Sequence, residues 1–176
     1  MPKLFVAFLL SMALLKANGQ VKTKAPLYLI INYNKTLADI TAGNNARSLG
    51  LGLQRFSKSH ALIKPTVEVA ADVYLMDDKL LRTWADGTPI STVGTMFTIF
   101  GGGYVNIDDY FYISVVGGPS FLGGQTLMGI KSSIGIHFDE EKQLTAKISY
   151  INILNREPRA KQNFTSLSFG LAIRIR

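Results

Sequence analysis

The 176-residue sequence contains no cysteine. The chain can therefore form no disulfide, use no thiolate as nucleophile or metal ligand, and carry no lipid on an N-terminal cysteine. Histidine is almost as scarce, because only His60 and His137 are present. We therefore expect no metal site and no cofactor. Charged residues make up only 18% of the chain, and its lysines and arginines form no stripe interleaved with aromatic residues, which argues against a nucleic-acid partner.

Helical periodicity is also absent after residue 20, whereas two-residue alternation of apolar and polar residues recurs in eight segments. Alternation of this kind predicts β-strands. Most segments are about as long as the nine to eleven residues that a tilted transmembrane strand needs, and longer than a typical strand of a soluble protein. The predicted strands are residues 27–36, 46–56, 65–76, 89–104, 110–117, 126–138, 143–155 and 164–176.

The stretch SLGLGLQRF, residues 48–56, indicates which face of these strands is apolar. Leu49, Leu51 and Leu53 form one row, and the opposite row holds mainly serine and glycine. Glycine weakens a strand and has no advantage on a solvated face, but it suits the crowded interior of a narrow closed barrel. We therefore predict that the leucines face lipid and that the small residues face inward.

Charged residues on the predicted inward face are few, and they come from four strands: Glu68, Asp72, Lys131, Lys147 and Arg174. In an eight-stranded ring the third strand lies opposite the seventh, so two acids would face several bases across the lumen. Buried charges persist only when they are paired and hydrogen-bonded. The favoured interpretation is an ion network that fills and seals the interior, and the alternative is a proton or ion path.

Residues 1–19 have the pattern of a secretory signal, with Lys3, the apolar run 4–15 and small residues before Gln20. The run is too short to span a bilayer as a helix. We predict cleavage that leaves 20–176 as the barrel domain. Lys3 and Lys16 would leave with the signal, which reduces the formal net charge from +7 to +5.

The predicted connections alternate between longer and shorter segments, as expected when longer loops lie outside the cell. The segments at 37–45, 77–88, 118–125 and 156–163 would be extracellular, and those at 57–64, 105–109 and 139–142 periplasmic. The first set includes Trp84, the only tryptophan, which we expect to contact an extracellular partner. The prolines, Pro119 among them, are expected in or beside connections, where a missing N–H does least harm.

The whole mature chain, ending in NFTSLSFGLAIRIR, resembles the small eight-stranded outer-membrane β-barrel proteins of Gram-negative bacteria, the OmpA/OmpX-like class. The resemblance implies an all-β, antiparallel up-and-down transmembrane barrel in the bacterial outer membrane. It also implies outer-membrane lipids as partners and a role in envelope structure or surface interaction. Members of the class typically end on an aromatic residue, whereas this chain ends on Arg176.

The sequence pattern is also compatible with two other functions. A soluble periplasmic barrel of lipocalin type would use the same alternation with the faces exchanged, and would hold an apolar ligand inside. An outer-membrane lipid hydrolase, similar to a lipid A deacylase, would need a nucleophile and a base within hydrogen-bond reach. Ser133 and His137 share a face of one predicted strand, but their spacing of four residues separates them by about 13 Å. The prediction is therefore a protein that is not an enzyme.

Overall fold

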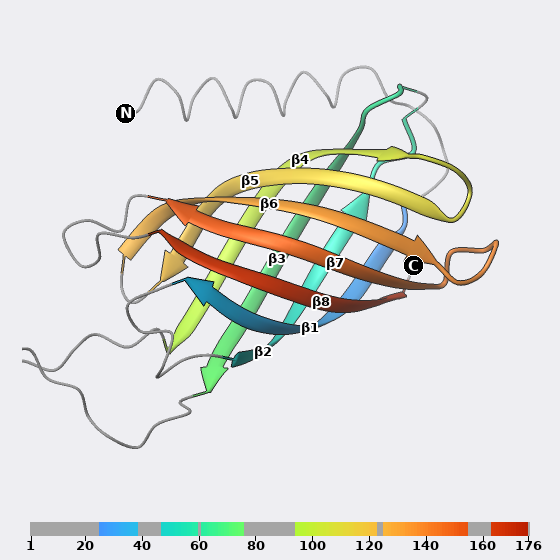
Figure 1. Ribbon diagram of the computed structural model, residues 1–176. Helices are drawn as coiled ribbons and strands as arrows, with labels where there is room; N and C mark the ends of the chain where they lie inside the picture. The colour runs from blue at the N-terminus through green and yellow to red at the C-terminus, as the bar shows by residue number, and fades with distance from the viewer. Residues whose placement is uncertain are drawn as a thin grey trace, which may run out of the picture.

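The computed structural model describes residues 25–38, 47–59, 61–75, 94–122, 125–154 and 163–175. Eight strands form one closed barrel in which each strand pairs antiparallel with its neighbours in the chain and β1 pairs with β8 (Figure 1). The strands are β1 (Leu27–Ala38), β2 (Arg47–Phe56), β3 (Lys64–Leu75), β4 (Thr95–Asn106), β5 (Phe111–Leu122), β6 (Gln125–His137), β7 (Leu144–Leu154) and β8 (Phe164–Arg174). No helix in the described residues is long and apolar enough to cross a membrane.

The eight predicted strands and their antiparallel order are confirmed, and the main differences are at strand ends. β4 begins at Thr95, six residues later than predicted, and residues 89–93 lie outside the described part of the chain. β5 continues to Leu122, so the expected connection at 118–125 is wrong. Pro119 lies inside β5 opposite Met128 of β6, where the β4–β5 ladder is interrupted between its pairs at Thr98 and Gly101. This interruption explains how a strand tolerates a residue without an N–H.

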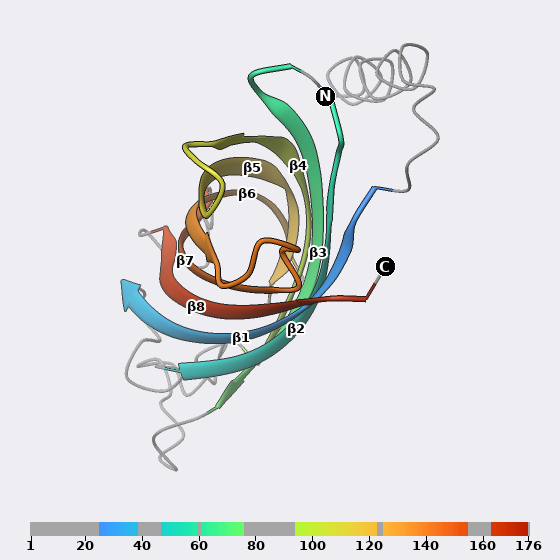
Figure 2. The same ribbon diagram turned by 90° about the vertical axis from the view of Figure 1, so that its right-hand side faces the viewer.

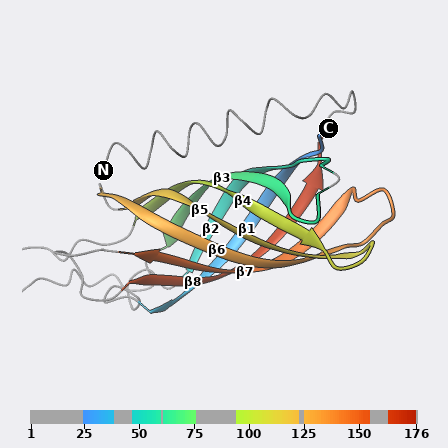
Figure 3. The same ribbon diagram turned by 90° about the horizontal axis from the view of Figure 1, so that it is seen from above.

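Barrel closure leaves no strand edge unpaired along the described ladders. β1 pairs with β2 on one side and with β8 on the other, and Asn34, for example, lies opposite both Ser48 and Ser168. Figure 2 shows the ring of strands nearly end on. We call the end at which β1 begins and β8 ends the terminal end, and the opposite end the loop end. Figure 3 shows the β2–β3, β4–β5 and β6–β7 connections together at the terminal end.

The two faces of the wall have opposite polarity. Leu51 and Leu171 face outward with 59% and 49% of their surface exposed, whereas Glu68 and Lys131 face inward and are each 2% exposed. The same alternation of exposed and buried residues runs along β2 and β5 and along most of β6 and β8, and in β4 it breaks at Gly101–Gly103. The face assignment is the predicted one. The lipocalin-type alternative, which needs the faces exchanged, is wrong on this point.

Large apolar and aromatic side chains lie on both faces of the wall, and the position of each in the alternation determines its face. Met96, Phe100 and Tyr112 point inward as their parity required, but Tyr110 lies in the β4–β5 connection and is exposed. Tyr28 and Tyr104 are buried inside the barrel, and the three exposed ones are Tyr33, Tyr110 and Tyr150.

Two apolar clusters cross the lumen at different heights. Near the terminal end, the ring of Phe56 packs edge-on against Tyr28, Tyr104 and Tyr112, with ring centroids 5.4, 4.7 and 5.4 Å away. The tyrosine hydroxyls also fix the connections there, because Tyr28 Oη donates to the Lys142 carbonyl at 2.7 Å. The second cluster, toward the loop end, contains Tyr74, Met96, Phe100, Val116, Leu122, Ile151, Ile153 and Phe164.

Inward glycines make room for large side chains on neighbouring strands, which explains the small residues of the inward rows. A Cβ at Gly135 would lie 2.1 Å from the ring of Tyr112 on the paired strand. That ring is 1% exposed and packs between Phe56 and the imidazole of His137, 5.2 Å away, so it has little freedom to move.

Replacing Gly135 with valine should therefore destabilise the barrel by about 1–3 kcal/mol, the usual cost of overpacking a filled interior. The measurement is urea unfolding of the refolded protein in detergent. Ser132→Val is the matched control, because Ser132 lies three residues before Gly135 in β6 and points outward. The control should unfold at the same urea concentration or a higher one, and equal destabilisation by both variants would contradict the assigned faces.

The β6–β7 connection is organised by one carboxylate. Asp139 accepts backbone N–H groups from Gln143 at 2.9 Å and from Leu144 at 3.1 Å, and Lys142 adopts a left-handed backbone with φ of 56°. The hydrogen bond from the Gln143 N–H, followed by that from Leu144, holds the pKa of Asp139 below its ordinary value of 3.8.

The lowered pKa of Asp139 predicts that the stability of this connection depends on pH in the acid range. The contribution of Asp139 to stability is complete above its unfolded pKa and is lost as the pH falls through the lower native pKa. An NMR titration should give the Asp139 carboxyl a midpoint below 3.8, and the Gln143 amide should shift with the same midpoint. In Asp139→Ala this transition should vanish from the Gln143 amide. A carboxyl midpoint at or above 3.8 would refute the arrangement.

Candidate functional site

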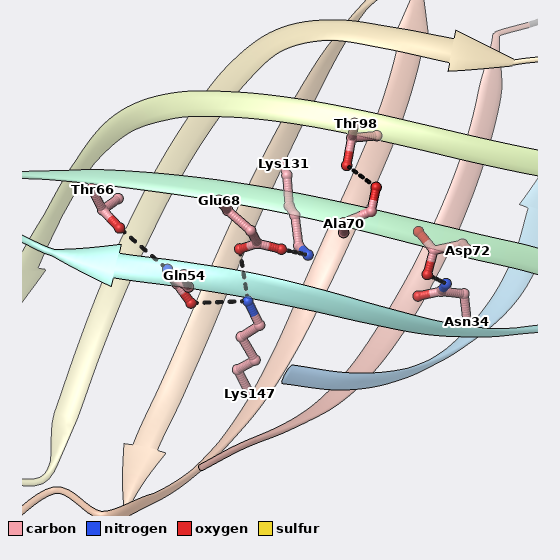
Figure 4. A network of polar contacts seen from close by, with 9 residues as sticks. All are labelled: Asn34, Gln54, Thr66, Glu68, Ala70, Asp72, Thr98, Lys131 and Lys147. Atoms are coloured by element: carbon pink, nitrogen blue, oxygen red, sulfur yellow. Dashed lines mark hydrogen bonds and ion pairs between the residues drawn. The ribbon is translucent and has the colours of Figure 1, made fainter. Parts of the chain in front are cut away.

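The centre of the lumen holds one carboxylate between two ammonium groups (Figure 4). Glu68 Oε1 accepts from Lys131 Nζ at 2.5 Å, and Glu68 Oε2 accepts from Lys147 Nζ at 2.7 Å. β3 supplies the glutamate and the far wall, β6 and β7, supplies the lysines. All three side chains are at most 2% exposed. The contacts therefore cross the barrel and tie opposite walls together.

Gln54 extends this centre toward the terminal end, a role that the sequence did not predict. It lies opposite Glu68 in the β2–β3 ladder, accepts from Lys147 Nζ at 3.1 Å, and donates to Thr66 Oγ1 at 3.4 Å. The predicted inward row of β2 already contained Gln54. Its place beside Glu68 became apparent only when the register between the two strands was known.

Asp72 lies four residues after Glu68 on the same inward face of β3, and its carboxylate has different partners. Its Oδ1 accepts from Asn34 Nδ2 at 2.7 Å, and the same amide group donates to Ser48 Oγ at 2.7 Å. Gly50 makes this possible, because a Cβ there would lie 1.8 Å from the Asp72 carboxylate. Both of the lumen ion pairs described above involve Glu68 rather than Asp72.

Arg174 does not belong to this group, which corrects the predicted network. It is exposed near the terminal end, where its Nη1 donates to the Glu141 carbonyl at 3.0 Å. Alternation gives the face of a residue but not its height along the barrel, and Arg174 is the last residue of β8. The structure thus brings together Glu68, Lys131 and Lys147, and places Asp72 beside them with a partner of its own.

We call Glu68, Asp72, Lys131 and Lys147 the charged layer, and it lies between the two apolar clusters. Phe100 of the loop-end cluster is the direct β4 neighbour of Glu68. On the other side, Tyr28 of the terminal-end cluster pairs with Gln54. Two carboxylates and two ammonium groups give this layer a formal charge of zero. Its chemistry is that of a neutral, cross-linked polar layer between two apolar ones.

The groups that a hydrolase or a metal site would use are placed elsewhere. His137 Nδ1 lies 2.7 Å from Thr145 Oγ1, and its ring stacks on Tyr112. Ser133 is buried on the same face of β6, but the side chain that meets the His137 Nδ1 atom is Thr145 and not Ser133. The described ranges contain no group of three histidine, aspartate or glutamate side chains that could hold a metal ion. His60 and Trp84 lie outside the described residues.

Comparison with known proteins identifies the fold. No protein-family model matches the chain, and neither does any curated protein. Among solved structures, a designed transmembrane β-barrel is similar, with a TM-score of 0.56, 10% identity, and coverage of 88% of this chain and 98% of the designed one. The crystal structure of Ail, the attachment invasion locus protein of Yersinia pestis, is also similar, with a TM-score of 0.57, 9% identity, and coverage of 87% of this chain and 100% of Ail. Ail in complex with the heparin analogue sucrose octasulfate has a TM-score of 0.55 and 9% identity, with coverage of 87% of this chain and 100% of Ail. The chain therefore shares the fold of small eight-stranded membrane barrels.

Proposed function

We propose that this protein is an integral outer-membrane β-barrel whose outer wall contacts lipid. The observation that carries the proposal is the inverted polarity of the wall, with leucine, isoleucine, valine and phenylalanine outside and ionised groups inside. In water such a surface would be a very large exposed apolar patch. In a bilayer such a surface is favourable. Closure of the barrel also gives the backbone N–H and C=O groups of the strands the hydrogen-bond partners that lipid cannot supply.

We further propose that the lumen is closed and that the protein acts through its surface. The side chains of the charged layer and of both apolar clusters fill the barrel at three successive heights, which supports closure. An eight-stranded barrel has an interior just wide enough for side chains to fill it. In planar bilayers, the protein is accordingly expected to give no steady single-channel conductance. An ion-selective conductance abolished by Glu68→Gln would favour the path interpretation instead.

The loop end is the proposed contact surface. Lys35 and Arg47 lie opposite each other near this end, and both are exposed on the outer face. Two exposed positive charges at this position favour an anionic partner over a cationic one. The similar protein Ail was solved with a sulfated heparin analogue, so we propose anionic headgroups or anionic glycans as partners here. The segment around Trp84 would contribute to the same surface.

We also propose how the protein reaches the outer membrane and that it is not an enzyme. Residues 1–19 would direct the chain across the inner membrane, and the function would be non-enzymatic, in envelope structure or adhesion. Fractionation of cells tests the membrane assignment. The protein should stay in the membrane through high salt and osmotic shock, leave it only with detergent, and migrate faster on gels before boiling than after. Release by osmotic shock alone would refute the proposal.

A further inference from the structure

The connection between β2 and β3 differs from the other connections at the terminal end. Its residues 57–59 and 61–63 are described, and Leu62 and Ile63 are 79% and 64% exposed. These are the two highest exposures among the large hydrophobic residues of the described chain. We call Leu62 and Ile63, with the preceding Lys58, the β2–β3 tip.

The tip continues the apolar outer surface of the wall. The ladder extends past the strand ends through a hydrogen bond from the Ser57 N–H to the Pro65 carbonyl, 2.9 Å long. Ile63 precedes Pro65 by two residues and therefore falls on the outward row of β3. Its Cγ2 lies 2.6 Å from where a Cβ of Gly103 would be, so it covers the outer surface of β4. The wall and the tip thus form one apolar surface.

The tip is also displaced sideways from the barrel. In Figure 2, which looks toward the terminal end, the β2–β3 connection stands well away from the ring of strands. The β4–β5 and β6–β7 connections stay close to the ring in the same view. A displacement of this kind carries the tip away from the lumen axis, toward the region that lipid occupies if the wall spans a membrane.

Charge distinguishes the tip from its neighbours. The β4–β5 connection carries Asp108 and Asp109, and the β6–β7 connection carries three acidic residues, Asp139, Glu140 and Glu141. The segment 57–64, SKSHALIK, has two lysines and no acidic residue. Of the two, Lys64 places its ammonium group 5.9 Å from the centroid of the Tyr104 ring, whereas Lys58 is exposed. Acidic connections favour water, but an exposed lysine beside an apolar pair suits the boundary of an anionic bilayer, since its long stem lets the ammonium group reach phosphates.

We propose that the β2–β3 tip is a lateral lipid anchor. Leu62 and Ile63 insert into the phospholipid leaflet at the terminal end, and Lys58 binds the anionic phosphates of its headgroups. The anchor rests on the proposed membrane function and adds to it a fixed side of attachment. The β2–β3 side of the barrel is thereby held deeper in the leaflet than the side that carries the acidic β4–β5 and β6–β7 connections.

Site-directed spin labelling tests the anchor, and the absence of native cysteine makes single-cysteine variants of the full chain straightforward. The variants are Leu62→Cys for the tip, Leu51→Cys for the wall and Glu140→Cys for an acidic connection. Each is refolded into vesicles of phosphatidylethanolamine and phosphatidylglycerol. Collision of the label with oxygen, which concentrates in hydrocarbon, is compared with collision with a water-soluble nickel chelate.

The label at Leu62 should favour oxygen several-fold over the label at Glu140 and approach the ratio found at Leu51. If the Leu51 label favours oxygen but the Leu62 label favours nickel, the anchor is wrong and the membrane function stands. If the Leu51 label itself favours nickel, the proposed function fails. Lys58→Gln provides a second readout: removing this lysine should abolish the increase in depth at Leu62 caused by added phosphatidylglycerol, and an unchanged increase would overturn the headgroup contact.

Discussion

Replacing Glu68 by glutamine is expected to reduce the free energy of unfolding by about 3–5 kcal/mol, the usual cost of removing one partner from a buried ion pair. Glu68 is the single carboxylate that contacts both Lys131 and Lys147, at 2.5 and 2.7 Å. The glutamine variant keeps the shape but leaves two buried ammonium groups without their anionic partner. Urea unfolding in lipid vesicles, followed by gel migration without boiling, measures the loss.

Two further variants separate a lost charge from a lost shape. In Glu68→Gln/Lys131→Met/Lys147→Met the uncompensated cations are gone, and most of the stability should return, since replacing a whole buried ion network by apolar side chains is often neutral or stabilising. Glu140→Gln, an exposed acid outside the lumen, should leave the unfolding midpoint unchanged. If Glu68→Gln is as stable as the wild type, Glu68 does not hold the two walls together.

Replacing Leu51 by arginine should cost about 2–4 kcal/mol in a bilayer, the penalty for a charged side chain near the midplane on the lipid face of a barrel. Leu51 lies midway along β2, is 59% exposed, and is flanked in the ladders by Ile31 and Ala71. On a soluble protein, an exposed leucine replaced by arginine changes stability little. The substitution therefore distinguishes a lipid-facing wall from a solvated one.

The control for this prediction is Ile175→Arg. Ile175 is similarly exposed, at 55%, but lies beyond the end of β8, at the terminal end. Its penalty should be about 0–1 kcal/mol, because the cost of a charge falls toward the interface. A flat profile, with equal small effects at Leu51 and Ile175, would contradict the assigned depth of β2 in the membrane.

The number, order and facing of the strands follow from alternation alone, because the period of two is a property of each strand by itself. Pro119 shows one limit of this reasoning. Proline usually marks a connection, yet Pro119 is accommodated in β5 because the β4–β5 ladder is interrupted at its position. The general preference of proline for connections gave a wrong prediction here, because a single sequence does not show where the pairing of two neighbouring strands is interrupted.

The candidate site shows a second limit. Glu68, Lys131 and Lys147 could be assigned to the inward face from parity, but so could Arg174, which lies at the exposed terminal end. Height along the barrel depends on the register of all eight strands, which the sequence leaves open. The pairing of Asp72 with Asn34, and the space that Gly50 leaves for it, depend on the same register.

The central claim is that hydrocarbon covers the aliphatic outer wall while the ionised groups lie in the lumen. The most direct test is an NMR measurement of magnetisation transfer in lipid nanodiscs, from acyl-chain methylenes and from water to the methyl groups of Leu51, Leu171 and Ala70. The account predicts transfer from acyl chains to both leucines and none to Ala70, which is 2% exposed on the inward face. Transfer from water to the leucine methyls, with no contribution from acyl chains, would contradict it.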